Sequence, residues 1–408
     1  ASSKLSNFGS KMQSVGKSMS MKLTLPLIAV GTAATKLALD FDKSMTQIES
    51  LVGVAADEVS KMGEAAKRMA TETGRSANEA AEALFFITSA GLRGADATDT
   101  LNASLKAAAV GLGETKIIAD LATSAMNAYG IENLGATAAT DVLTAAVREG
   151  KLEASELAGA MGGVIPIASN MGVSFDQVGA ALAAMSKTGT NAANGATQLN
   201  AILASIAKPT AGAEEAFNKM GLSSDSLKQS LAEKGLMGTL VMLRQKLKES
   251  GQEFTDIAPN VRAWKGVLDL TGSSMEDNIQ LFDRMTRSTG ATEEAFQKTS
   301  KSASFQFAKG MATVKNSLTE IGITILPIVT EAVKKFSVFI KGVTDRFKNL
   351  SPQTKNFVLT LTGIAMAIGP MLIMFGKLAT GISALGPILP IAASGFRLLT
   401  AAMIANPI

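Results

Sequence analysis

The chain has 408 residues and a formal net charge of +4, from 39 basic and 35 acidic side chains. That length accommodates roughly two to four domains, and so small a net charge gives no reason by itself to expect nucleic acid or a membrane surface as a partner. The sequence contains no cysteine and no histidine, so it lacks disulfides, thiolate metal ligands and the commonest general base, which weighs against an enzyme.

The composition predicts an all-α protein. Aromatic residues make up only 5% of the chain against 47% hydrophobic residues, and there are 20 methionines. Alanine, leucine and methionine are among the strongest helix formers. We expect a globule of helical hairpins, followed by long extended helices and then by an apolar helical pair.

Residues 1–40 are expected to form a basic and apolar N-terminal arm. Several lysines precede the first acidic residue, Asp40, and residues 23–35, LTLPLIAVGTAAT, carry no charge. A basic stretch followed by an apolar one resembles a secretory signal, and it also fits an amphipathic arm that docks on a partner. We favour the arm, because the apolar stretch is too short to span a bilayer and a helical pattern resumes directly after it.

A helical core domain is predicted over residues 41–210, and it opens with apolar residues that recur alternately four and three positions apart. This average spacing, close to 3.5 residues, is typical of helices that pack along their length in coiled coils. Gly53 is expected to interrupt the pattern, so two amphipathic helices within one bundle fit equally well. The pattern comprises Phe41, Met45, Ile48, Val52, Ala55, Val59, Met62, Ala66 and Met69.

Short helices with glycine ends follow. Ser-x-x-Glu at 76–79 and Ser-x-x-Gln at 174–177 are capping-box patterns, which satisfy backbone amides at the start of a helix. The helices they open are expected to stop at Gly91 and Gly189, because glycine readily adopts the conformation that ends a helix. Further helices are predicted at 97–110, 115–129 and 136–149, ending near Gly111, Gly130 and Gly150.

The stretch KTGTNAANGATQLNAILASIAKP, residues 187–209, joins a glycine-rich segment to an apolar helix. A glycine-rich turn at the start of a helix can hold phosphate, but no strand precedes this one. Gly189 and Gly195 supply backbone freedom, and asparagines tolerate the left-handed conformation. We therefore predict that residues 187–195 form the turn of a helical hairpin, whose second helix, 196–207, is closed by Pro209.

Residues 211–290 are expected to form a helical connecting region, and residues 291–350 long helices. An amphipathic helix is predicted at 236–251, with Leu240, Leu243 and Leu247 aligned on one face. The only tryptophan lies in PNVRAWKGVLDLTG, beside Arg262. Arg262 and Trp264 fit either a binding anchor or a core tryptophan with a capping arginine, and we favour the second.

Residues 351–408 differ in kind from the rest. The stretches 357–375 and 378–396 contain no charged residue, and basic residues flank them. About twenty apolar residues span the hydrocarbon core of a bilayer, so the pair is interpreted as two potentially membrane-active helices. The alternative is that they are buried against copies of themselves in a larger assembly.

No motif for catalysis, cofactor binding or metal binding is complete. VGKS at 15–18 ends like a P-loop, but Lys11 stands where the motif needs its first glycine. GLG at 111–113 lacks the third glycine of a dinucleotide site, and Lys116 is found instead. Asp96 and Asp99 lack the further ligands of a calcium loop and are interpreted as caps. Paired glutamates at 214–215 and 293–294 are expected to begin helices, where they complement the helix dipole.

Two long segments resemble the core of bacteriophage tail tape measure proteins. They are residues 41–92, beginning FDKSMTQIESLVG and ending ITSAGL, and residues 171–209, beginning MGVSFDQVGAALAAMSKTGTN. IGITILPIV at 321–329 and SPQTKNFVLTLTGIAMAIGPML at 351–372 resemble segments that commonly follow, and PNVRAWKGVLDLTG also fits. The resemblance covers most of residues 1–375 and corresponds to the N-terminal core of the family.

The resemblance implies a non-enzymatic ruler that occupies the lumen of the tail tube, sets tail length and templates tube assembly. It further implies release during infection, which helps DNA pass through the host envelope. The implied partners are the tail tube protein, the tail tip or distal tail protein, tail assembly chaperones and further copies of the chain. A host membrane is a conditional partner, and any contact with DNA is incidental.

The implied location is the tail lumen of the virion, after assembly in the host cytoplasm, with the host membrane a location only during ejection. No catalytic, cofactor-binding or metal-binding residue is expected, and no cofactor. The chain is expected to continue beyond Ile408, because the family's long helical middle is not seen here. The alternative function is a membrane-active, pore-forming protein that uses the apolar pair at 357–396.

Overall fold

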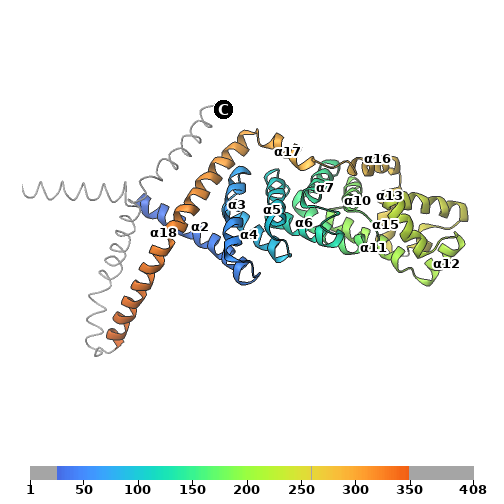
Figure 1. Cartoon of the computed structure of the whole chain (residues 1–408). Helices are drawn as coiled ribbons and strands as arrows, with labels where there is room; N and C mark the ends of the chain where they lie inside the picture. Colours follow the sequence, from blue (N-terminus) through green and yellow to red (C-terminus); the bar gives the residue numbers. More distant parts are fainter. Residues whose placement is uncertain (1–24, 259, 349–408) are drawn as a thin grey trace, which may run out of the picture. The chain divides into compact units, whose positions relative to one another are not determined.

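The protein is all-α over the residues that the structure describes. The computed structural model describes residues 25–258 and 260–348, and within these ranges it contains helices and no strand (Figure 1). The predicted fold class is therefore confirmed. Most of the predicted N-terminal arm, the break at 351–352 and the apolar pair at 357–396 lie outside the described residues.

The helices follow the glycine punctuation of the sequence closely, since the predicted segments 97–110, 115–129 and 136–149 correspond to α5, α6 and α7. The described helices are α2 (Leu25–Ser50), α3 (Ala56–Glu72), α4 (Ala77–Ser89), α5 (Gly94–Ala109), α6 (Thr115–Tyr129), α7 (Ala136–Glu149), α8 (Ala154–Gly162), α9 (Ile165–Asn170), α10 (Phe175–Lys187), α11 (Ala192–Ala207), α12 (Ala211–Lys219), α13 (Ser224–Ser250), α14 (Phe254–Ile257), α15 (Val261–Thr271), α16 (Met275–Met285), α17 (Ala291–Thr299) and α18 (Ala303–Lys348).

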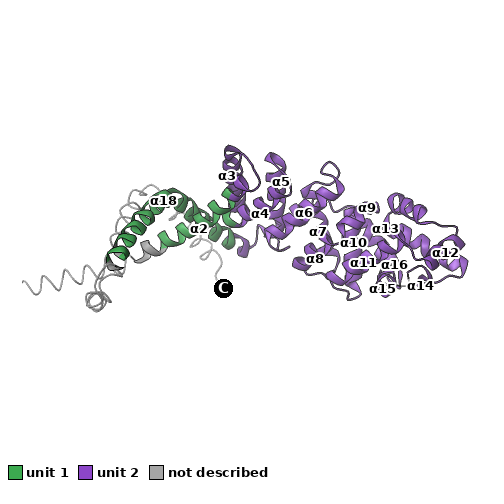
Figure 2. Ribbon diagram, turned by 90° about the horizontal axis from the view of Figure 1, so that it is seen from below, with its two compact units in different colours: residues 1–46, 76–78, 307–408 green, residues 47–75, 79–306 purple. Residues whose placement is uncertain are grey.

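The chain divides into two compact units, coloured separately in Figure 2. Unit 1 comprises residues 1–46, 76–78 and 307–408, and among its described residues it consists mainly of α2 and α18. Unit 2 comprises residues 47–75 and 79–306 and contains the intervening helices.

In unit 2 the helices follow chain order from α3 to α12, which lies at the far end in Figure 2. The later helices return along the earlier ones, since α15 packs against α11, α16 against α10, and α17 against α5 and α7. α5 packs against α3, α6 and α7, and α10 packs against α7, α11 and α16. The core between them is built from many alanines with leucine, isoleucine and methionine, among them Leu101, Leu143, Leu157 and Leu182, which are fully buried or nearly so. Small side chains let neighbouring helices approach closely, which explains how a chain with few aromatic residues forms a dense core.

In unit 1, α2 and α18 cross at small residues. A β-carbon placed on Gly322 of α18 would collide with the backbone carbonyl of Ala34 and would lie 2.6 Å from the β-carbon of Ala38. Near this crossing, the buried Asn316 side chain accepts a hydrogen bond of 2.7 Å from the backbone N–H of Ala77. Glycine at position 322 is therefore required by the close contact between the two helices.

The predicted seam from Phe41 to Met69 does not form one continuous coiled coil. α2 ends at Ser50 and α3 begins at Ala56, and between them Gly53 adopts a φ of +74°. The alternative of two separate amphipathic helices is correct, because the left-handed conformation at Gly53 breaks the helical path.

Several predicted helix boundaries are wrong. α11 begins at Ala192 rather than 196, and the stretch predicted as long helix from 291 is divided by a turn at 300–302. Ser174 is the N-cap of α10, as its pattern predicts, but its side chain makes no capping hydrogen bond. Asp96 and Asp99 are not caps, since both lie inside α5, whose N-cap is Arg93.

Other local predictions hold. Leu240, Leu243 and Leu247 are all buried in the second half of α13, which bends at Gly235. Glu293 and Glu294 lie in the first turn of α17, and Glu214 lies in the first turn of α12, where negative charge complements the helix dipole.

Candidate functional site

The predicted turn of a helical hairpin is present but shorter than predicted, since it comprises residues 188–191 and Gly195 lies inside α11. α10 ends at Lys187, Gly189 adopts a φ of +92°, and Asn191 caps α11 by accepting a hydrogen bond of 2.9 Å from the backbone N–H of Asn194. The hydroxyl of Thr190 donates to the Asp269 carboxylate on α15 at 2.9 Å, and Lys265 Nζ donates to the same hydroxyl at 3.4 Å. The turn is thereby fixed to α15, which fits a structural role for these polar residues.

Two further glycines allow α10, α11 and α15 to pack closely. A β-carbon on Gly195 would lie 3.1 Å from Leu182 Cδ2, and one on Gly266 would lie 3.0 Å from both Gln198 Cβ and Ile202 Cδ1. Both glycines therefore lie where a larger residue would force its neighbours to move. The hairpin and α15 form a tightly packed three-helix group within unit 2.

The expectation that Trp264 is a core residue is wrong. Its side chain is 39% exposed, and Val261 and Leu268 on the same helix are also exposed, at 71% and 43%. The residues that α15 buries are Ala263, Gly266, Val267, Leu270 and Thr271 on its other face. Arg262 is exposed as well, and its backbone N–H, rather than its side chain, takes part in the cap made by Asn260. The outer face of α15 thus carries an aromatic residue available for contact.

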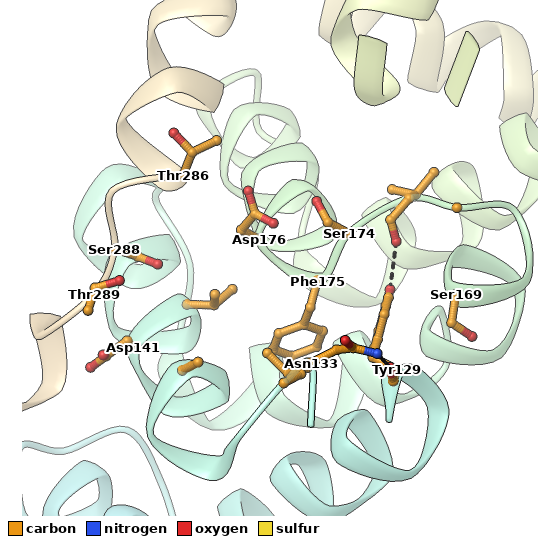
Figure 3. A pocket seen from close by; sticks show the side chains of 15 residues that line it. Tyr129, Asn133, Asp141, Ser169, Ser174, Phe175, Asp176, Thr286, Ser288 and Thr289 are labelled. Atoms are coloured by element: carbon orange, nitrogen blue, oxygen red, sulfur yellow. Dashed lines mark hydrogen bonds between the residues drawn. The ribbon is translucent and has the colours of Figure 1, made fainter. Parts of the chain in front are cut away.

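A pocket of about 440 Å³ opens in unit 2 between the start of α10 and the segment before α17 (Figure 3). Tyr129 and Phe175 form part of its wall, with ring centroids 6.0 Å apart. The Tyr129 hydroxyl donates to the carbonyl oxygen of Val173 at 2.9 Å. Burial, followed by the nearby negative charge of Asp176, raises the pKa of Tyr129, so its hydroxyl remains a neutral donor.

The buried carboxylate at the edge of this pocket is already fully engaged. Asp141 accepts hydrogen bonds from the backbone N–H groups of Gly290 and Thr292, at 2.7 Å and 2.8 Å. Asp141 and Tyr129 were not singled out from the sequence. Tyr129 is the single tyrosine of the chain, which is a usable signal, whereas nothing near Asp141 in the sequence points to partners 149 and 151 residues away.

The other stretches considered as cofactor- or metal-binding candidates do not form a site among the described residues. The GLG stretch at 111–113 forms the turn between α5 and α6, and VGKS at 15–18 lies outside the described residues. Over residues 25–258 and 260–348, no group of three or more histidine, cysteine, aspartate or glutamate side chains is placed to hold a metal ion. Within the same ranges, no helix is both long enough and apolar enough to cross a membrane.

α18 carries a stripe of apolar residues, several of which are exposed. Its apolar residues recur every three or four positions, and Phe307, Met311, Ile328 and Phe339 are each more than a third exposed. We call this stripe the α18 seam. Its members are Phe307, Met311, Val314, Leu318, Ile321, Ile325, Ile328, Ala332, Phe336 and Phe339, of which Ile325 is buried.

Comparison with known proteins identifies phage tail proteins as relatives. The family described as "Phage-related minor tail protein" matches residues 63–258. The chain is 25% identical over 388 residues to the "Tape measure protein" of Pneumococcus phage Dp-1, covering 93% of this chain and 33% of that protein. It is 22% identical over 360 residues to the "Probable tape measure protein" of Clostridium phage phiCD119, covering 85% of this chain and 37% of that protein.

The matched part of the chain therefore spans about a third of the length of these curated relatives. No solved structure matches it. The family match begins in α3 and ends just after α14, so it includes the hairpin turn and the pocket residues from Tyr129 to Asp176, but not Thr286, Ser288 and Thr289.

Proposed function

The chain is a relative of the tape measure proteins of bacteriophage tails, and from that premise we propose that it occupies the lumen of the tail tube and sets tail length. In this function the protein acts as a scaffold rather than as a catalyst. The tube protein would polymerise around it until the scaffold is covered, so the length of the scaffold would determine the length of the tube.

Apart from the similarity to tape measure proteins, the observation that supports the proposal is the long helix α18. A ruler has to be long in one dimension, and α18 runs without interruption for 46 residues. At a rise of 1.5 Å per residue, this helix measures about 69 Å. Pro327 lies within α18 and is exposed, so the helix continues past a residue that usually ends or kinks one.

We further propose that copies of the chain associate along the α18 seam. From Phe307 to Ala332 the seam residues alternate four and three positions apart, which is the spacing of a coiled coil. Ile328 and Phe339 are 55% and 53% exposed, so the C-terminal half of the seam has no full apolar cover among the described residues. Covering it with the same face of another copy would bury this apolar surface.

The remaining parts of the function follow the resemblance and are proposals too. They are contacts with the tube protein, the tail tip protein and assembly chaperones, and release that assists DNA ejection through the host envelope. The alternative, a pore-forming protein, depends on residues 357–396, which lie outside the described part of the chain.

The proposal is tested by changing the length of α18 in a phage that carries this chain. Removing residues 328–348 shortens the ruler by about 32 Å if they are helical, and the tail should shorten accordingly. Tails of unchanged length, measured by electron microscopy on intact particles, would exclude the ruler function for this segment.

A further inference from the structure

The helix that precedes α18 has few fully buried side chains. α17 has nine residues and packs on α5 and α7, but Ala291 and Thr292 alone among them are buried. Phe296 is half-buried, with its ring centroid 5.6 Å from that of Phe305 and 5.7 Å from Lys106 Nζ. Because hydrophobic stabilisation scales with the apolar area removed from water, the apolar contribution to the docking of α17 comes mainly from Ala291 and Phe296, and polar contacts supply the rest.

The most buried of these contacts is made by Asp141 of α7, which is only 1% exposed. One of its carboxylate oxygens accepts from the backbone N–H of Gly290 at 2.7 Å, and the other accepts from Thr292 at 2.8 Å. Asp141 therefore caps the start of α17 from a different helix, a role that the side chain of the N-cap residue usually fills. Its negative charge also lies at the positive end of the helix dipole.

Further polar contacts surround this pair. The hydroxyls of Thr144 and Thr292 lie 2.7 Å apart in a buried position. Lys106 of α5 forms an ion pair of 2.7 Å with Glu293, and its hydrogen bond, followed by one from Gln297, lowers the pKa of the Glu293 carboxyl. We call the contacts of Asp141, Thr144 and Lys106 with residues 290–293 the polar clasp. Partly exposed ion pairs contribute little individually, so the clasp depends on Asp141.

Turns flank α17 on both sides. The segment 286–290 leads to it from the end of α16 and ends at Gly290, which adopts a φ of +83°. The turn at 300–302 follows it and leads to α18. Figure 3 shows Thr286, Ser288 and Thr289 of the first segment along one side of the pocket. Both ends of α17 are therefore joined to the neighbouring helices by turns rather than by continuous helix.

We propose that α17 is a latch, which undocks from α5 and α7 when the polar clasp opens, while the core helices of unit 2 remain folded. Undocking turns residues 286–302 into a linker, which can reach roughly 55 Å when fully extended. The role of this latch rests on the proposed function. A ruler protein that is compact when free and extended inside a tube needs a segment of its chain that can extend. Lengthening at the clasp would uncover Ala291 and the half-buried Phe296, while the core helices of unit 2 stay packed.

Hydrogen exchange on the purified chain tests the latch directly. Asp141→Asn keeps the size of the side chain but replaces one acceptor oxygen by an amide group that cannot accept. Exchange of the backbone amides at 294–299 should become at least tenfold faster, while the amides of α10 keep their rates. The matched control is Asp120→Asn on α6, an exposed aspartate, which should change neither.

Equal acceleration in α17 and α10 would overturn the latch, because α17 would then open only with the whole unit. Unchanged exchange in α17 would overturn it too.

A second variant keeps the test valid if Asp141→Asn does not fold. The chain has no cysteine, so Thr144→Cys with Thr292→Cys creates a single possible disulfide at the clasp.

Oxidation of that pair should slow exchange at 294–299 at least tenfold relative to the same protein after reduction. Identical rates in the oxidised and reduced forms would contradict the latch. These measurements use no phage and no tail, so their failure is distinct from a failure of the ruler function.

Discussion

Gly322 of α18 lies directly against the backbone carbonyl of Ala34 in α2, at the crossing of the two helices. There is no room between them for a methyl group. In an ordinary helix, glycine is less favourable than alanine by roughly 0.5–1 kcal/mol. Here the contact outweighs that intrinsic preference, so the identity of residue 322 decides how closely the two helices pack.

Gly322→Ala is therefore expected to destabilise the pairing of α2 with α18 by about 1–3 kcal/mol, the usual range for overpacking. The measurement is hydrogen exchange of the α2 amides, which should become faster. Gly342→Ala in the same helix is the control, because a β-carbon there meets no other atom within 4 Å. The control should leave α2 unchanged and raise the helix content slightly.

Tyr129 provides a prediction about alkaline pH. Because burial raises its pKa, the folded protein holds the phenolic proton more tightly than the unfolded chain, whose tyrosine has a pKa of about 10. The stability that this group contributes is fully present below pH 10 and is lost as the pH rises above it. The free energy of unfolding should therefore fall as the pH rises above 10, while the tyrosine of the folded protein stays protonated.

The test is a spectrophotometric titration near 295 nm combined with circular dichroism. Since the chain contains a single tyrosine, the tyrosinate signal reports Tyr129 alone. Tyrosinate absorbance and loss of helix should appear together. Reversible ionisation near pH 10 with the helix signal intact would contradict the buried environment. Tyr129→Phe should lose the hydrogen bond to Val173, with an expected loss of about 1–3 kcal/mol for the acceptor left buried and unpaired.

The α18 seam gives a prediction about self-association. Ile328→Asp with Phe339→Asp places two charges on the exposed part of the seam, where association would have to bury them without a partner. Sedimentation of the purified chain should shift from oligomer to monomer. The control is Thr330→Asp with Thr344→Asp, two exposed positions of α18 that are not in the seam. Equal oligomer content in both variants would show that copies do not meet along this face.

The sequence predicts the local features of this fold well, for identifiable reasons. Gly53, Gly130 and Gly189 all adopt positive φ values, and glycine tolerates that conformation better than any other residue. Helix ends near such glycines are therefore visible in the sequence. The hairpin turn was predictable for the same reason, together with the apolar periodicity of the helices on either side, although α11 begins at Ala192 rather than at 196.

Features that depend on distant residues were not predictable. Trp264 was interpreted as a core tryptophan with Arg262 as a cap, yet α15 packs through its small residues Ala263 and Gly266 and leaves the indole partly exposed. The engagement of Asp141 by Gly290 joins residues 149 positions apart, and no local pattern marks either. The same holds for Gly322 and Ala34, since both look like ordinary residues of apolar helices.

The ruler itself is tested most directly by measuring tail length in a series of phages in which residues 328–348 are deleted, unchanged or duplicated. Cryo-electron microscopy of intact tails should give lengths that change by about 32 Å per step, which is 1.5 Å for each residue removed or added. A permuted segment of the same length and helical propensity should leave the length unchanged. Tails of one length throughout the series would contradict the account.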